Sequence, residues 1–167
     1  MLTSLLMIAF AAAAPLSEGG NGTYTLSDST AALTTRTDAA LEATLEPMNF
    51  ALRMIAEGRL QGAITTCSTY TFTTDDVMMR IQCDSKPPIK GALNGSPTPY
   101  TNEKGVTYAV TVQKSVDQVV FNYAGESATQ VTTYRFTDDG LVVSKEIRSA
   151  NLEVPMRWDT NYTRGTP

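Results

Sequence analysis

The chain has 167 residues, of which 42% are hydrophobic and 18% are charged, and these values are typical of one globular domain. Its net charge of −4 argues against binding to nucleic acid, which requires a basic surface. The chain has no histidine and only two cysteines, so it lacks the commonest general base and cannot form a tetrahedral Cys/His zinc site. The composition therefore favours a non-catalytic protein without a cofactor over an enzyme.

The first residues follow the pattern of a secretory signal peptide. An apolar run from Leu5 to Ala14 leads into small residues, and Ala11 and Ala13 provide an A-x-A cleavage site. We therefore predict a signal peptide over residues 1–13, a linker over 14–21 and one domain over 22–167. Because no Lys or Arg precedes the run, a buried N-terminal helix is the alternative. The run is shorter than the about 20 residues of a membrane-spanning helix, so we expect no stable membrane span. These features predict an exported protein, periplasmic or secreted, and we expect a monomer.

Residues 21–26 predict a short strand, and a helical pattern follows over about residues 29–61. In the first helix, Leu41 and Leu45 lie four residues apart, and Thr37 or Asp38 is a candidate N-cap. Pro47 is expected to end this helix at the residue before it. A second helix, ended by Gly58 or Gly62, is expected to bury a stripe made of Met48, Leu52, Ile55 and Leu60.

After Ile64 the hydrophobic period changes to two residues, which predicts strands. The expected strands are Ile64–Phe72, Val77–Cys83, Val106–Gln113, Val119–Tyr123, Ala128–Thr137, Leu141–Arg148 and Met156–Thr163. The segment KPPIKGAL is expected to be a broken edge strand, and residues 94–105 are expected to form the longest loop. Across the turn KSVDQ, we expect cross-strand pairs of Val112 with Val119, Val110 with Phe121, and Tyr108 with Tyr123.

Short turns between these strands indicate an antiparallel meander, which must close or be covered at its edges. The predicted fold class is therefore mainly β with N-terminal helices. We expect the meander to close into a lipocalin-like β-barrel with the helical pair as its plug or lid.

Both cysteines lie in the segment TTCSTYTFTTDDVMMRIQC, which predicts a hairpin. If residues 74–76 form the loop, Cys67 faces Cys83 and the two can form a disulfide. If residues 73–76 form the loop, Phe72 faces Val77, and the cysteines lie on opposite faces. An exported protein with only two cysteines favours the disulfide, whereas matching of apolar residues favours the second register. A β-bulge can reconcile the two registers.

The order of one strand, two helices and a long meander is similar to that of the calycins, the lipocalin and fatty-acid-binding barrels. Exported bacterial proteins of unassigned activity also resemble this layout, through the segments PMNFALRMIAEGRL (47–60), YRFTDDGLVVSKEIRS (134–149) and VPMRWDTNYTR (154–164). The Gly-x-Trp signature of lipocalins is replaced here by GTY at residues 22–24. The resemblance implies a barrel that holds a small ligand, and no enzymatic activity.

In such a barrel an interior arginine beside a tyrosine can hold a ligand carboxylate through two hydrogen bonds. The candidate ligand-binding residues are Tyr134, Arg135, Arg157, Trp158, Tyr108 and Met79. The alternative is that the arginines lie on the solvent face and that the methionines fill the core. For an enzyme, Glu146 and Asp159 are a conceivable carboxylate pair, although no sequence feature orients them.

The sequence thus predicts an exported, non-catalytic protein that binds a small apolar or amphipathic ligand in a β-barrel. The alternative function is an envelope structural or protein-interaction domain whose barrel is filled with side chains. An enzyme is the third hypothesis, and the lack of histidine makes it the weakest.

Overall fold

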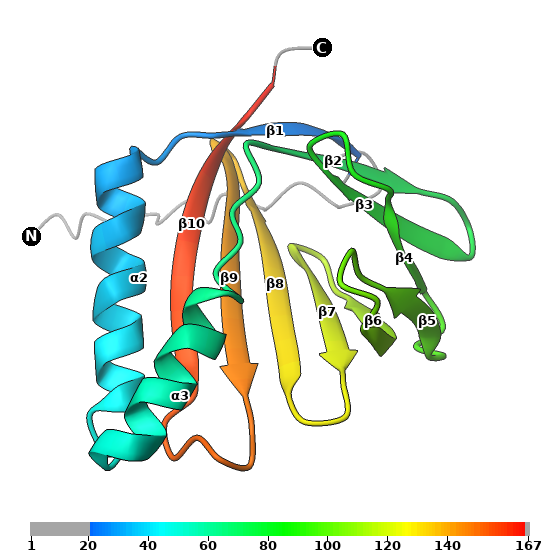
Figure 1. Cartoon of the computed structure of the whole chain (residues 1–167). Coiled ribbons are helices and arrows are strands. Elements are labelled where there is room, and N and C mark those ends of the chain that lie inside the picture. The colour runs from blue at the N-terminus through cyan, green and yellow to red at the C-terminus, as the bar shows by residue number, and fades with distance from the viewer. Residues whose placement is uncertain (1–20, 166–167) are drawn as a thin grey trace, which may run out of the picture.

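The computed structural model describes residues 21–165, and the predicted signal peptide and most of the predicted linker lie outside these residues. Figure 1 shows one short strand, a pair of helices and a long antiparallel meander. The helices are α2 (Thr30–Leu45) and α3 (Phe50–Gln61). The strands are β1 (Gly22–Leu26), β2 (Thr69–Thr74), β3 (Met78–Cys83), β4 (Ile89–Ala92), β5 (Thr98–Thr101), β6 (Thr107–Lys114), β7 (Gln118–Ala124), β8 (Thr129–Thr137), β9 (Gly140–Arg148) and β10 (Met156–Arg164).

The ten strands form one antiparallel sheet in the order β4-β3-β2-β1-β10-β9-β8-β7-β6-β5. The sheet curls until its two ends meet, and within the described residues these ends show no strand pairing to each other. They touch through side chains instead: a Cβ atom added to Gly91 of β4 would lie 2.0 Å from Cγ2 of Val112 on β6. The fold is therefore a nearly closed barrel, as the sequence predicted.

The two helices cover one end of the concave face of the sheet, beside β9 and β10 (Figure 1). Leu41 and Leu45 of α2 and Leu60 of α3 pack against Ile147 of β9 and Met156 of β10. This cluster also contains Trp158 and is separate from the main core, which fills the other end of the barrel. None of the helices in the described part of the chain has the length and apolar character needed to cross a membrane.

The N-cap of α2 is Ser29, whose side chain accepts a hydrogen bond from the backbone N–H of Ala32, so the prediction of a cap at residue 37 or 38 was wrong. The predicted buried stripe of the second helix was also wrong. Leu52 and Ile55 are 57% and 59% exposed, and Leu60 is the one buried residue of α3. Gly62 ends the helix as expected. The helix was misjudged because it contacts the barrel along a narrow line near its end, rather than along a continuous face.

Both predicted registers of the cysteine hairpin were wrong. The structure pairs Tyr70 with Cys83, Phe72 with Ile81 and Thr74 with Met79, so that apolar side chains match on the concave face. Cys67 precedes β2, and it still bonds Cys83 because the chain bends there, with a Cα–Cα distance of 5.4 Å. The predicted disulfide is therefore present in the structure, although its geometric argument was incorrect.

The hairpin of β6 and β7 is also shifted from the expected register, by two residues. Val112 pairs with Phe121 and Val110 with Tyr123, which keeps the expected face inward. The predicted edge strand is confirmed as β4. Residues 98–101, which were expected to be loop, form β5 at the other sheet edge. A proline in this short strand is tolerated because an edge strand has unpaired backbone groups on one side.

Helix α2 covers the half of β10 that has no strand neighbour on one side. β1 pairs with only the last part of β10, from Tyr162 onward. Beyond that point, Asn161 N–H donates to Asp28 Oδ2 at 2.6 Å, and Arg36 of α2 donates to the carbonyl of Asp159 at 2.7 Å. Burial raises the pKa of Asp28, but hydrogen bonds from Arg36 and Asn161 outweigh this effect and lower it overall. Side chains thus replace the missing strand.

Candidate functional site

Aromatic side chains fill the end of the barrel away from the helices. The rings of Tyr70, Phe72 and Tyr134 contact one another, with centroids 5.2–6.1 Å apart. Tyr162 also contacts Tyr70, with the ring centroids 5.1 Å apart, and Tyr123 is buried beside Phe121. Such edge-to-face contacts add to the stability that burial itself provides. This end of the interior is therefore a packed core.

The tyrosine hydroxyls inside this core form a hydrogen-bonded row. Tyr134 bonds to Tyr123 on one side and to Tyr70 on the other, and Tyr70 also bonds to Tyr162. Tyr162 in turn donates to the backbone carbonyl of Cys67 at 2.9 Å. Burial raises the pKa of each of these phenols, so all four are neutral at physiological pH. They satisfy one another and do not form an anion site.

The unusual charge in the interior is Lys145, at the centre of β9. The residue is only 7% exposed, because it lies on the same inward face of the strand as Val143 and Ile147. Its ammonium group donates to the backbone carbonyl of Thr65 and, at 3.2 Å, to Thr65 Oγ1. Thr65 belongs to the connecting segment, defined as residues 62–68, which joins α3 to β2. The contact therefore holds this segment across the concave face of the sheet.

Within residues 21–165 no carboxylate forms an ion pair with Lys145. Burial without a counter-charge lowers the pKa of Lys145 to about 8. Besides Thr65, the ammonium group has the ring of Trp158 as a favourable partner, with the ring centroid 5.9 Å from Nζ. About one in ten such lysines is neutral at pH 7, by the ordinary titration relation.

Lys145 lies in a polar layer between the two apolar clusters. Cross-strand pairing places it between Thr132 of β8 and Trp158 of β10. Thr132 is 1% exposed and accepts a hydrogen bond from the side chain of Gln130 at 3.2 Å. Within the described part of the chain the indole Nε1 of Trp158 is buried and has no hydrogen-bond acceptor. A buried donor without a partner costs free energy, so this layer is suited to receive an acceptor group.

The predicted ligand-binding residues divide between the two faces of the sheet. Tyr134, Met79 and Trp158 are buried in the interior, and Tyr108 is partly buried beside the main core. The two arginines lie on the outer face instead, as the alternative interpretation expected. Arg135 is exposed, and Arg157 is exposed and forms an ion pair with Glu146 at 3.1 Å.

The lysine in the interior was overlooked because it was grouped with the exposed arginines of the same strands. A signal for it was available in the sequence. In LVVSKEIR the residues Leu141, Val143 and Ile147 share one parity with Lys145, and residues of one parity point to one face of a strand.

The outer face of β8, β9 and β10 carries a shallow, open hollow of about 260 Å³. Glu146 and Asp159, the conceivable catalytic pair, both line it. Hydrogen bonds from Arg148, and then from Arg157, lower the pKa of Glu146 although partial burial opposes them. Glu146 is therefore ionised at neutral pH, which does not suit a general acid.

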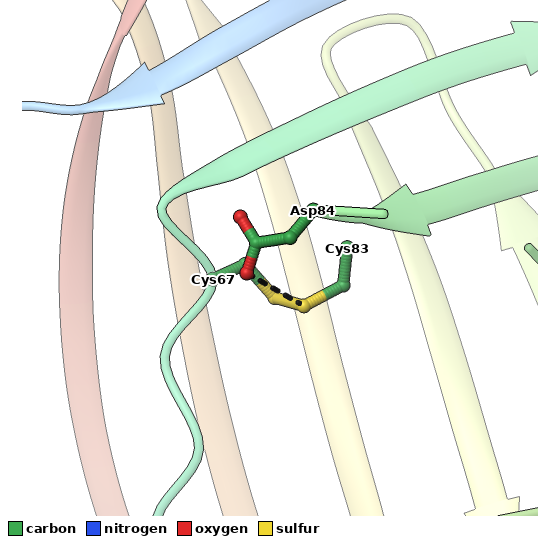
Figure 2. A group of neighbouring side chains, drawn as sticks. All are labelled: Cys67, Cys83 and Asp84. Carbon is green, nitrogen blue, oxygen red and sulfur yellow. Dashed lines mark hydrogen bonds between the residues drawn. A yellow bond between two sulfur atoms is a disulfide. The ribbon is translucent and has the colours of Figure 1, made fainter. Parts of the chain in front are cut away.

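The disulfide lies where the connecting segment meets β2. Figure 2 shows the carboxylate of Asp84 beside it, with one oxygen 3.8 Å from Cys83 Sγ. Asp84 has a left-handed φ of 53°, and its other oxygen accepts the backbone N–H of Thr69 at 2.9 Å. Two sulfurs and a carboxylate within 4.8 Å resemble a metal-binding group, but the disulfide uses the thiolates that a metal would require. We assign Asp84 to the turn after β3.

Comparison with known proteins supports the fold. No protein-family model and no curated protein matches the chain. Among solved structures, lipid binding protein 8 of Caenorhabditis elegans aligns with 89% of this chain and 97% of its own, at 11% sequence identity and a TM-score of 0.51. The chain therefore has a calycin-type fold like that of lipid-binding proteins, as its order of elements predicted.

Proposed function

We propose that the protein is a non-catalytic binding protein for a small amphipathic molecule. The apolar part of this molecule would lie between the helical pair and the sheet, and its polar end would meet the donors of Lys145 and Trp158. The observation that carries the proposal is a buried ammonium group without a counter-ion, beside an indole N–H without an acceptor. A ligand with an acceptor at one end would satisfy both groups.

The weak anchorage of α3 supports entry of a ligand at this end of the barrel. One residue of this helix is buried, and Phe50 on its outer side is 78% exposed. Segments with few buried apolar contacts open most readily. Movement of α3 would uncover Met156 and Trp158 while leaving the aromatic core intact. The fold resemblance supports this proposal too, because the matched nematode protein is described as a lipid binding protein.

Trp158 is the only tryptophan, so its fluorescence reports on this site directly. We expect decanol and decanoate, titrated into protein freed of bound lipid, to change the emission saturably. Ala56→Trp would place a large ring in the cluster beneath α3 and should abolish the change, whereas Ala51→Trp on the exposed side of the same helix should not. Because these variants add a second fluorophore, their binding is read by calorimetry. Absence of saturable binding to the wild-type protein would contradict the proposal.

Dense packing of the aromatic end favours a second candidate, a protein-interaction domain with a filled barrel. This candidate predicts that neither amphiphile binds and that no small molecule accompanies the protein purified from its own host. Native mass spectrometry distinguishes the two functions, because only the first predicts a retained ligand.

We propose that the protein is exported and that residues 1–13 are removed. The apolar run before Ala14 and the disulfide both support this proposal, since disulfides persist in oxidising compartments. Sequencing the N-terminus of the protein isolated from its host tests it. A mature chain that retains its first residues would contradict export through a cleaved signal.

A further inference from the structure

We infer that Lys145 is a nucleophile that binds aldehydes as a reversible imine inside the barrel. This inference rests on the proposed function, because it specifies the chemical class of ligand at the same site. It starts from the geometry around the Lys145 amine.

The two hydrogen bonds of Lys145 are sufficient for its neutral amine, which is the minor form at pH 7 and the form that attacks an aldehyde. Such an amine has two N–H bonds and one lone pair, and the structure provides two acceptors, the carbonyl and the hydroxyl of Thr65. Both acceptors belong to one residue of the connecting segment. In the neutral form Thr65 occupies both N–H bonds, and no donor among residues 21–165 bonds to the lone pair. A lysine that is buried without a carboxylate partner is more often neutral than an exposed one, and the lowered pKa of Lys145 agrees with this.

The surroundings also suit an imine. Trp158 and Ile147 flank the amine along the apolar cluster, and exclusion of water from such a site slows the hydrolysis of an imine. Lys145 lies in the middle of a nine-residue strand, so its position is fixed by the sheet. The other four lysines of the chain, Lys86, Lys90, Lys104 and Lys114, are all exposed.

The reaction is a balanced condensation. The Nζ lone pair attacks the aldehyde carbon, and the carbonyl oxygen takes up two protons and leaves as water. Both protons come from the amine nitrogen, so a C=N bond replaces the C=O bond. No oxidant or reductant takes part, and addition of water reverses the reaction.

Reductive trapping tests this inference. The full-length protein is incubated with one equivalent of decanal and sodium cyanoborohydride, and the adducts are located by peptide mass spectrometry. We expect one major product, heavier by the mass of the aldehyde less one oxygen atom, on the peptide that contains Lys145. Lys145→Met should reduce total labelling at least tenfold, whereas Lys114→Met at an exposed position should not. Labelling spread evenly over all five lysines would overturn the inference.

A parallel titration separates this inference from the proposed function. Decanol has the same chain but cannot form an imine, and decanoate offers a carboxylate. If these bind and decanal gives no Lys145 adduct, the binding function stands and imine formation is refuted. If none of the three changes Trp158 fluorescence, both proposals fail together. Lys145→Arg keeps the charge and loses the nucleophile, so it should give no adduct at residue 145.

Discussion

Replacing Lys145 with methionine is expected to stabilise the protein at neutral pH. The pKa of this lysine falls from an ordinary value of 10.5 to about 8 in the folded chain. At about 1.36 kcal/mol for each pH unit, burial of the charged form costs about 3 kcal/mol. Methionine has a similar shape and no charge, so Lys145→Met removes this cost. The lost partner of Thr65 can be replaced by water, since Thr65 is exposed. The expected net gain is about 1–3 kcal/mol.

The same substitution should remove a pH dependence. Between about pH 8 and 10.5 the unfolded chain holds a proton on Lys145 that the folded chain has lost, so the free energy of unfolding rises with pH. Below about pH 8 both states hold the proton, and the free-energy cost of burying the charged lysine is present in full. The buried tyrosines act in the opposite sense: burial raises the pKa of Tyr134, so above about pH 10 the unfolded chain loses phenolic protons that the folded chain keeps.

Urea unfolding followed by Trp158 fluorescence, between about pH 7 and 9.5, is the appropriate assay. We expect the free energy of unfolding of the wild-type protein to rise by about 2 kcal/mol across this range. For Lys145→Met this rise should be absent, and the exposed control Lys114→Met should keep it. A Lys145→Met protein that is less stable at pH 7 and retains the wild-type slope would refute the assigned cost of burial.

Three further predictions concern stability. Replacing Cys67 and Cys83 together with serine should lower the free energy of unfolding by about 3 kcal/mol, because the bond closes a loop with a sequence separation of 16; an unchanged urea midpoint under oxidising conditions would contradict this. Gly91→Ala should destabilise by about 1–3 kcal/mol by forcing apart the two ends of the sheet, whereas Gly58→Ala, which meets no atom within 4 Å, should stabilise by about 0.5–1 kcal/mol. Equal effects of the two glycine substitutions on the melting temperature would argue against close contact between β4 and β6. Leu60→Ala should cost about 3 kcal/mol, since this residue is the buried anchor of its helix; a loss below 1 kcal/mol would show that α3 is held by other contacts.

The sequence was sufficient to predict the fold class because each strand carries its own alternation of apolar and polar residues. The order of elements then led to the barrel, since short turns leave few alternatives to a meander. The registers between paired strands, in contrast, could not be predicted from this alternation. In the β2–β3 hairpin, Tyr70, Phe72 and Thr74 pair with residues that neither predicted register matched to them. The bend that brings Cys67 to Cys83 depends on the connecting segment, which no local pattern predicts.

The candidate site was predicted only in part, for a related reason. Trp158 and Tyr134 were placed correctly in the interior by their apolar character. Arg157 was considered with them because it adjoins Trp158 in sequence, but adjacent residues of a strand point to opposite faces. For Lys145 the error was the reverse. This residue has the same parity as the inward-facing Val143 and Ile147, and it is buried although it is charged. Burial of a lysine depends on the acceptors of Thr65, which lie 80 positions away in the sequence.

The half of β10 beyond β1 has a consequence for self-association. A strand edge with free amide and carbonyl groups is a template on which a second molecule can add a strand. Here that template is occupied by the side chains of Asp28 and Arg36, which form an ion pair at 2.6 Å with each other as well as bonding the strand. Asp28, between β1 and α2, and Arg36 of α2 thus block this edge against pairing with a second molecule. Replacing Asp28 or Arg36 would therefore leave a backbone amide or carbonyl of β10 without its partner at this edge.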